Sequence, residues 1–411
     1  MYPGGAPTIR GEVQGYSPAV LRKIEFAGAN QHSFEGAATA LDRLAELPIS
    51  AKHVQRLTER LGQERTAQRD EEVAQRKAGT WKPAHAQAPA VAVIHVDAGK
   101  VQLRAEDGRP GVRQPHWGDT KVACFQTYAA QTHRTDPRPQ PPAAFLDPPR
   151  VLRLCQEIAQ VRSDPATRPT APAAPHRHGR RGSASGPVGL VRTAVATTGP
   201  VEDFAWRVAA EATRRGFYQA PLRALVGDGG NWIVPLGQQH FPGWVQVLDF
   251  VHLLTHLHAG AMAAWRGRYA RAWALYEELL RAAWAGKVGQ VQATLQQHLQ
   301  RLGVPPEGAA DDDPRRVVSL TLAYVTANAG RMDYPRYRRE GLPVSSAAVE
   351  SLVKQFNQRI KGTEKFWLRG GVEAVLQVRA AYLSQDDRAE AFHAHRPRGR
   401  AAGSHRFHAA A

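Results

Sequence analysis

Residues 90–97 read AVAVIHVD, and this run decides the fold that we expect. Before Asp97 it consists of Ala, Val and Ile with His95 as its one polar side chain, which is typical of a strand buried on both faces of a sheet. Gly99 is typical of a turn, and residues 101–104 are expected to form a further short strand. The run therefore predicts a central strand that ends on a carboxylate.

Strands and helices are expected to alternate along the region that follows, which indicates an α/β core. The expected strands are 121–128, 191–197, 222–227 and 244–248, and the expected helices are 151–158 and 202–215. Asp228 directly follows one of these strands and Asp249 another. Acidic residues thus recur at the ends of apolar strands.

Composition and periodicity divide the chain into five parts. They are a helical region at 1–80, a core at 88–250, a helical insertion at 251–340 with a break at 303–306, a core helix region at 341–387 and a basic tail at 388–411. Residues 163–187, inside the core, are rich in Pro, Ala, Arg and Gly. Neither this segment nor the tail has enough apolar residues to build a core, so we expect both to be disordered or looped.

Residues 17–75 show helical spacing, interrupted by a turn at 47–50, with Ser50 as the expected N-cap of the next helix. Basic residues, among them Arg56, lie off the apolar stripe of that helix. Two helices across a tight turn, the second of them basic, are typical of a helix-turn-helix, in which Arg56 would contact DNA. A plain helical hairpin has the same pattern, and only the charge favours DNA.

The charge balance favours a polyanionic partner. Lys and Arg outnumber Asp and Glu by 54 to 37, a formal net charge of +17 over 411 residues, and the commonest partner of such a chain is nucleic acid. Cys124 and Cys155 give neither a disulfide framework nor a zinc-binding spacing, so we expect a reducing, cytoplasmic location on the nucleoid. The most apolar stretch, 244–265, carries one Asp and three His, which disfavours a membrane span.

Three carboxylates form the candidate site. Asp97 and Asp228 are expected to end buried strands, and Glu350 lies in the first turn of a helix expected to begin near Ser345 or Ser346. Strand ends and a helix give carboxylates rigid supports, and oxygen donors suit Mg²⁺ or Mn²⁺. Two such ions can activate the attacking oxygen and stabilise the leaving oxygen of a phosphodiester.

Each of these residues also has a structural interpretation. Asp97 lies before Ala98-Gly99 and Asp228 before Gly229-Gly230, and both can form turns, in which Asp is favoured. Glu350 can stabilise the helix dipole and pair with Lys354 one turn later. Periodicity alone leaves both interpretations open.

Three segments resemble the motifs of bacterial insertion-sequence DDE transposases. Residues 93–102 (VIHVDAGKVQ) resemble the first-aspartate motif, and residues 226–233 (VGDGGNWI) resemble the second. Residues 341–351 (GLPVSSAAVES), continuing to 367, resemble the long glutamate motif. The resemblance covers roughly residues 17–390. Ala98 departs from the family's usual glycine, and the insertion at 163–187 is not typical of the family.

The resemblance implies an α/β fold with a ribonuclease-H-like catalytic core, a helical insertion before the glutamate and a small helical N-terminal domain. It assigns catalysis and the binding of two Mg²⁺ or Mn²⁺ ions to Asp97, Asp228 and Glu350. Asp249 and His252 resemble an accessory D-x-x-H motif, although a strand-end Asp beside a buried His has the same pattern. The implied activity is cleavage of transposon ends and their transfer to target DNA, by a homodimer or larger assembly.

Basic and aromatic residues beyond Glu350 are candidate DNA contacts. Lys354, Lys361 and Lys365 would bind phosphates, and Trp367 would stack on an unpaired base, unless it belongs to the core. Two other functions fit the same sequence: a ribonuclease-H-like nuclease without strand transfer, and an inactive relic that only binds DNA.

Overall fold

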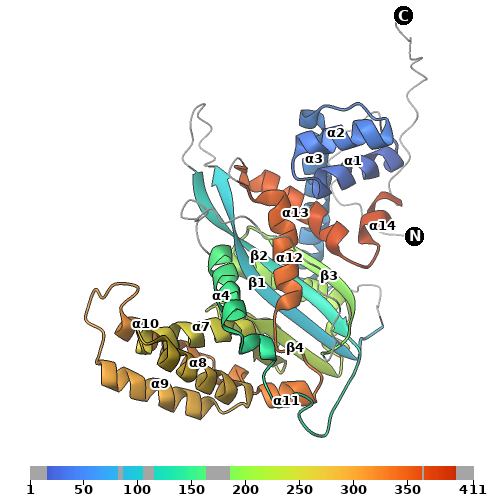
Figure 1. The fold of residues 1–411 in the computed structure, drawn as a ribbon. Coiled ribbons are helices and arrows are strands. Elements are labelled where there is room, and N and C mark those ends of the chain that lie inside the picture. Colours follow the sequence, from blue (N-terminus) through green and yellow to red (C-terminus); the bar gives the residue numbers. More distant parts are fainter. Residues whose placement is uncertain (1–15, 82–86, 105–114, 163–185, 363–364, 395–411) are drawn as a thin grey trace, which may run out of the picture.

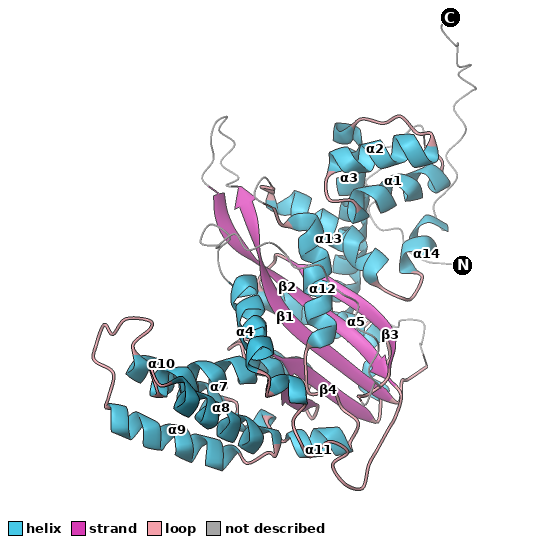
Figure 2. Ribbon diagram, in the orientation of Figure 1, coloured by secondary structure: helices cyan, strands magenta, loops and turns pink. Residues whose placement is uncertain are grey.

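The computed structural model describes residues 16–81, 87–104, 115–162, 186–362 and 365–394 (Figure 1). These residues form a mixed α/β fold in which one five-stranded sheet lies between helices (Figure 2). The strands are β1 (Val91–Arg104), β2 (Pro115–Tyr128), β3 (Gly189–Thr197), β4 (Leu222–Gly227) and β5 (Val245–Leu248). The expected α/β class is therefore confirmed, and so are the expected strands, except that 101–104 is the continuation of β1 rather than a separate strand.

The sheet has the order β3-β2-β1-β4-β5. β1 and β3 run antiparallel to β2, whereas β4 and β5 run parallel to β1. The turn expected at Gly99 is wrong: β1 continues through it, and Gly99 pairs with Thr120. A Cβ at Gly99 would lie 3.1 Å from the Thr120 hydroxyl oxygen, so this glycine allows a close contact between neighbouring strands.

Both faces of β1 are covered, as its apolar run predicts. Val91 and Val93 pack with helix α7 (Phe250–Ala264), while Ile94 and Val96 pack on the other face with α5 (Val201–Arg214). Two further helices flank the sheet, α4 (Pro148–Arg162) and α6 (Ile233–His240). The helices expected at 151–158 and 202–215 correspond to α4 and α5, and most of the insertion expected at 163–187 lies outside the described residues.

A run of helices follows β5, in the part of the chain where the sequence predicts a helical insertion. It comprises α7, α8 (Tyr269–Trp284), α9 (Val288–Leu302), α10 (Pro314–Ala327) and α11 (Tyr334–Arg339). Its core contains Tyr276, Trp284 and Leu257, and the break expected at 303–306 separates α9 from α10. After α11 the chain returns to the sheet as α12 (Ala347–Ile360), which carries Glu350 and packs on β1 and β2. No helix in the described parts of the chain is both long and apolar enough to cross a bilayer.

The N-terminal helices are α1 (Pro18–Asn30), α2 (Phe34–Ala45) and α3 (Ala51–Lys77). The expected N-cap is confirmed, since the Ser50 side chain accepts a hydrogen bond from the backbone N–H of His53. α3 packs along α13 (Arg369–Leu383). The contact is close: a Cβ on Gly62 would lie 2.2 Å from the backbone oxygen of Ala374.

The basic tail is partly ordered, against expectation. Residues Arg388–Ala394 form α14, while 395–411 lie outside the described residues. Polar contacts hold this helix: His393 Nε2 lies 2.6 Å from Glu25 Oε2 in a buried hydrogen bond, and Arg388 pairs with Glu211 and Asp386. Composition could not predict this helix, because two of these partners, Glu25 and Glu211, lie far away in the sequence.

Candidate active site at the carboxylate cluster

The sheet register brings three aspartates into one row. Val96 of β1 pairs with Gly227 of β4, and Gly227 pairs with Leu248 of β5. Because these strands are parallel, the residues that follow, Asp97, Asp228 and Asp249, lie next to one another at the same edge. The prediction that Asp97 ends its strand is wrong, because pairing with β2 continues β1 to Arg104, whereas Asp228 and Asp249 do follow strand ends. Backbone pairing brings the three acids together.

Asp97 is buried, and its surroundings oppose its charge. Burial and the neighbouring charge of Asp228 raise the pKa of Asp97 to about 7, although His252 acts in the opposite direction. Its Oδ1 accepts a hydrogen bond of 2.7 Å from the backbone N–H of Ala98. Two neighbouring carboxylates repel each other when both are charged, and a bound cation would reduce this repulsion.

Both carboxylate oxygens of Asp249 accept hydrogen bonds. It caps α7, accepting from the backbone N–H groups of Val251 and His252. Ser346, at the start of α12, donates its backbone N–H at 3.0 Å and its hydroxyl at 2.8 Å to the same carboxylate. Burial raises the pKa of Asp249, but the hydrogen bonds from His252 and Ser346 outweigh it and hold this pKa below its usual value. Asp249 therefore joins the first turns of α7 and α12.

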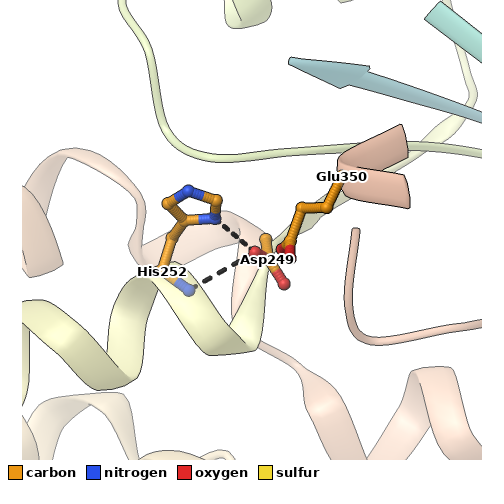
Figure 3. A group of neighbouring side chains, drawn as sticks. All are labelled: Asp249, His252 and Glu350. Atoms are coloured by element: carbon orange, nitrogen blue, oxygen red, sulfur yellow. Dashed lines mark hydrogen bonds and ion pairs between the residues drawn. The ribbon is translucent and has the colours of Figure 1, made fainter. Parts of the chain in front are cut away.

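His252 is oriented by Asp249. Its Nδ1 is hydrogen-bonded to Asp249 Oδ2, and the other ring nitrogen points away from that carboxylate (Figure 3). Burial lowers the pKa of His252, but the bond to Asp249 and the charges of Asp228 and Asp97 raise it to about 9. The protonated ring thus offsets part of the negative charge in the cluster.

Glu350 completes the cluster from α12. One ligand atom each from Asp249, His252 and Glu350 lie within 4.8 Å of one another. Burial, and then the charge of Asp249, raise the pKa of Glu350. The Ser346 hydroxyl oxygen lies 3.1 Å from Glu350 Oε1, so one serine side chain contacts both acids.

A small cavity of about 40 Å³ opens onto these side chains, and Asp97, His252 and Glu350 contribute to its wall. The opposite wall is α4, through Leu154 and Ile158. The part of α4 whose side chains are described therefore lies over the carboxylates.

The donor set fits divalent cations that prefer oxygen ligands. Asp97 lies within β1, Asp228 follows the end of β4 and Glu350 lies on α12. Burial, and then neighbouring acids, raise the pKa values of Asp97 and Glu350. Asp249 fits less well as a ligand, since both of its oxygens already accept hydrogen bonds. The sequence motif pairs Asp249 with His252, and in the structure a hydrogen bond to Asp249 orients the His252 ring.

The expected DNA contacts lie in different environments. Lys354 is exposed on α12, and its Nζ lies 3.2 Å from Glu157 Oε2. Lys361 is half-buried just after α12. Arg56 is exposed on α3, among the N-terminal helices rather than at the carboxylates.

One of the expected contacts is wrong, and a second residue has a structural role at the helix end. Trp367 is 8% exposed, packs in the core between α12 and α13, and donates its indole N–H to the Ile360 carbonyl at 2.8 Å, so it cannot stack on a base. Lys365 donates to the carbonyls of Gln358 and Arg359 and caps the C-terminus of α12. Helical spacing predicts the face of a residue on its own helix, but both of these residues lie beyond the helix end.

Three contacts at the site were not predicted from the sequence. Ser346 was expected only near the start of a helix, but its hydroxyl contacts two acids. Tyr324 of α10 donates its hydroxyl to the backbone carbonyl of Asp228 at 2.7 Å. Glu157 pairs with Lys354 across the site. Of these three contacts, the sequence could have indicated only the one between Ser346 and Glu350, which lie four residues, or one helical turn, apart.

We expect Glu157→Gln to strengthen DNA binding several-fold and to make it more sensitive to salt. Both partners of the pair are about half exposed, so its loss changes stability little, whereas the freed Lys354 gains a phosphate contact. Fluorescence anisotropy on a labelled duplex over a range of salt concentrations measures this.

The matched control is Glu307→Gln, which removes the same charge at an exposed position between α9 and α10. Lys354→Ala combined with Lys361→Ala should weaken binding and flatten the salt dependence. Equal effects of Glu157→Gln and Glu307→Gln would mean that only net charge matters.

Comparison with known proteins adds no family assignment. No protein-family model matches the chain, and no curated protein matches it significantly.

Proposed function

We propose that this chain is a DDE-type transposase that uses Mg²⁺ or Mn²⁺ to cleave the ends of an insertion sequence and to join them to target DNA. The observation that carries the proposal is the row Asp97, Asp228 and Asp249 on parallel strands, completed by Glu350 on α12. Burial and neighbouring acids raise the pKa values of Asp97 and Glu350, and such shifts cluster at functional sites.

A ribonuclease-H-like core is the fold that accompanies this proposal. It is supported by the mixed sheet, by acids after the paired segments of β1 and β4, and by a glutamate on a helix that packs on the sheet. The helical unit from α7 to α11 lies between Asp228 and Glu350 in the sequence, which is the order that the resemblance implies.

The chain's own groups have distinct tasks in this proposal. Asp97, Asp228 and Glu350 supply oxygen ligands, for two ions. Asp249 orients His252, whose protonated ring limits repulsion among the acids. When bound, divalent ions lower the pKa of the attacking hydroxyl or water and stabilise the leaving oxygen.

DNA would approach over α12 and α4, where Lys354 is exposed. The N-terminal helices provide a second surface: α2 and α3 meet at a tight turn, and Arg56 is exposed on the second of them, as in a helix-turn-helix. Since two transposon ends must be joined, the proposal includes a homodimer or larger assembly on DNA.

Labelled DNA carrying the sequences that flank the gene tests the proposed function. We expect metal-dependent nicks at the ends and a joined product with target DNA, both abolished by EDTA. Nicks without joining would favour a ribonuclease-H-like nuclease over a transposase. DNA binding without nicks, with either Mg²⁺ or Mn²⁺ present, would mean that the protein binds DNA but does not cleave it.

A further inference from the structure

The loop that carries Asp228 is held from outside the sheet. Asp228 is followed by Gly229, whose φ of +84° lies in the left-handed region, and by Gly230, whose N–H donates to Asp228 Oδ1 at 3.0 Å. The backbone carbonyl of Asp228 accepts a hydrogen bond of 2.7 Å from the hydroxyl of Tyr324, which belongs to α10 of the helical unit.

The Tyr324 ring is itself fixed in place. It stacks on His256 of α7, with ring centroids 3.8 Å apart and an interplanar angle of 18°. A Cβ on Gly229 would lie 2.8 Å from the ring and 2.9 Å from its hydroxyl, so glycine is required for this approach. The close fit leaves the hydroxyl little freedom to point elsewhere.

A second group from the same unit holds the strand ends before the loop. Arg331, buried just after α10, contacts the carbonyl of Gly227 at 3.4 Å and that of Val247 at 3.3 Å. Its other nitrogen donates to Asn328 at 3.0 Å. The helical unit therefore contacts the backbone on both sides of the Asp228 Cα.

We propose that Tyr324 is a positioning residue for Asp228: its hydroxyl fixes the Asp228 peptide and thereby directs the carboxylate toward Asp97. In this arrangement the helical unit completes the metal site without supplying a ligand. The inference rests on the proposed function, because it concerns the affinity of the same carboxylates for divalent cations.

Tyr324→Phe removes only the hydroxyl and keeps the ring stacked on His256. We expect this variant to bind Mn²⁺ roughly 3- to 10-fold more weakly, as one lost hydrogen bond implies. Electron paramagnetic resonance of free Mn²⁺, titrated into the full chain without DNA, measures the affinity. Half-maximal DNA cleavage should need more Mn²⁺ by the same factor, while the rate at saturating Mn²⁺ stays close to that of the wild type.

Tyr337→Phe is the matched control. Its hydroxyl also donates to a backbone carbonyl of the sheet, that of Gln246 at 3.2 Å, but away from Asp228. We expect similar melting temperatures for the two variants and a weaker Mn²⁺ affinity for Tyr324→Phe alone.

Two results would overturn the inference while leaving the proposed function intact. One is an Mn²⁺ affinity of Tyr324→Phe equal to that of Tyr337→Phe. The other is a much lower melting temperature for Tyr324→Phe, since the hydroxyl would then support the fold rather than the carboxylate. If the wild type bound no Mn²⁺, the metal site itself would fail, and both proposals with it.

Discussion

Replacing Asp97 or Asp228 by Asn should abolish metal-dependent DNA cleavage, with a loss on the order of 1,000-fold or more. Each change removes a charged ligand, and metal stabilisation of a phosphoryl transition state amounts to several kcal/mol. The fold should persist: burial and Asp228 raise the pKa of Asp97 to about 7, so a neutral side chain removes repulsion. Cleavage of labelled DNA and thermal unfolding at pH 8 measure the two effects.

Asp119→Asn provides the control on the neighbouring strand. Asp119 is exposed on β2 and pairs with Lys100 at the surface, 2.6 Å away, so its loss should change neither cleavage nor stability appreciably. Cleavage retained by the Asp97 or Asp228 variant would remove that residue from the site.

The second large effect is expected on stability. Asp249→Ala removes a carboxylate that accepts hydrogen bonds from the first turn of α7, from the His252 ring and from Ser346. Breaking a buried, hydrogen-bonded pair of this kind costs about 3–5 kcal/mol of unfolding free energy. Urea unfolding followed by circular dichroism measures it.

The pH dependence has a defined sign. Hydrogen bonds hold the pKa of Asp249 below its ordinary value, so its contribution is complete above that value, about 4, and is lost as the pH falls further. The wild type and Asp249→Ala should therefore differ less in stability at pH 3 than at pH 7. Asp313→Ala, which removes the partly exposed N-cap of α10, should be far milder. Equal losses in the two variants would show that capping alone explains the role of Asp249.

The strands of the sheet, and the acids that follow their apolar runs, can be predicted from the sequence because both are local features. These acids are Asp97, Asp228 and Asp249. Val96, Gly227 and Leu248 are apolar or small and precede acids, which is visible without a structure. Their pairing in one row depends on long-range register, which no local pattern specifies. The same limit applies to Tyr324, whose contact with Asp228 spans 96 residues.

The differences between the predictions and the structure also have physical reasons. Trp367 and Lys365 follow α12, where helical spacing no longer determines the direction of a side chain. Both turn back onto α12 and hydrogen-bond its last carbonyls. Gly99 looks like a turn residue, but two long paired strands keep it extended. In each case tertiary packing overrides a local preference.

The position of α4 adds a constraint that the sequence did not suggest. Leu154 and Ile158 face the carboxylates across a cavity of about 40 Å³, and Glu157 pairs with the exposed lysine of α12. A nucleic-acid backbone is larger than this space, so we expect α4 to shift when DNA binds. The Glu157→Gln comparison reports on the ionic part of this contact.

Diffraction from crystals of the full chain soaked in Mn²⁺, recorded near the manganese absorption edge, tests the central claim most directly. We predict an anomalous peak bound by the carboxylates of Asp97 and Asp228, with Glu350 beside it. The peak should be lost in Asp228→Asn. Manganese found only elsewhere on the chain, or no peak at Mn²⁺ concentrations that support DNA cleavage, would contradict the account.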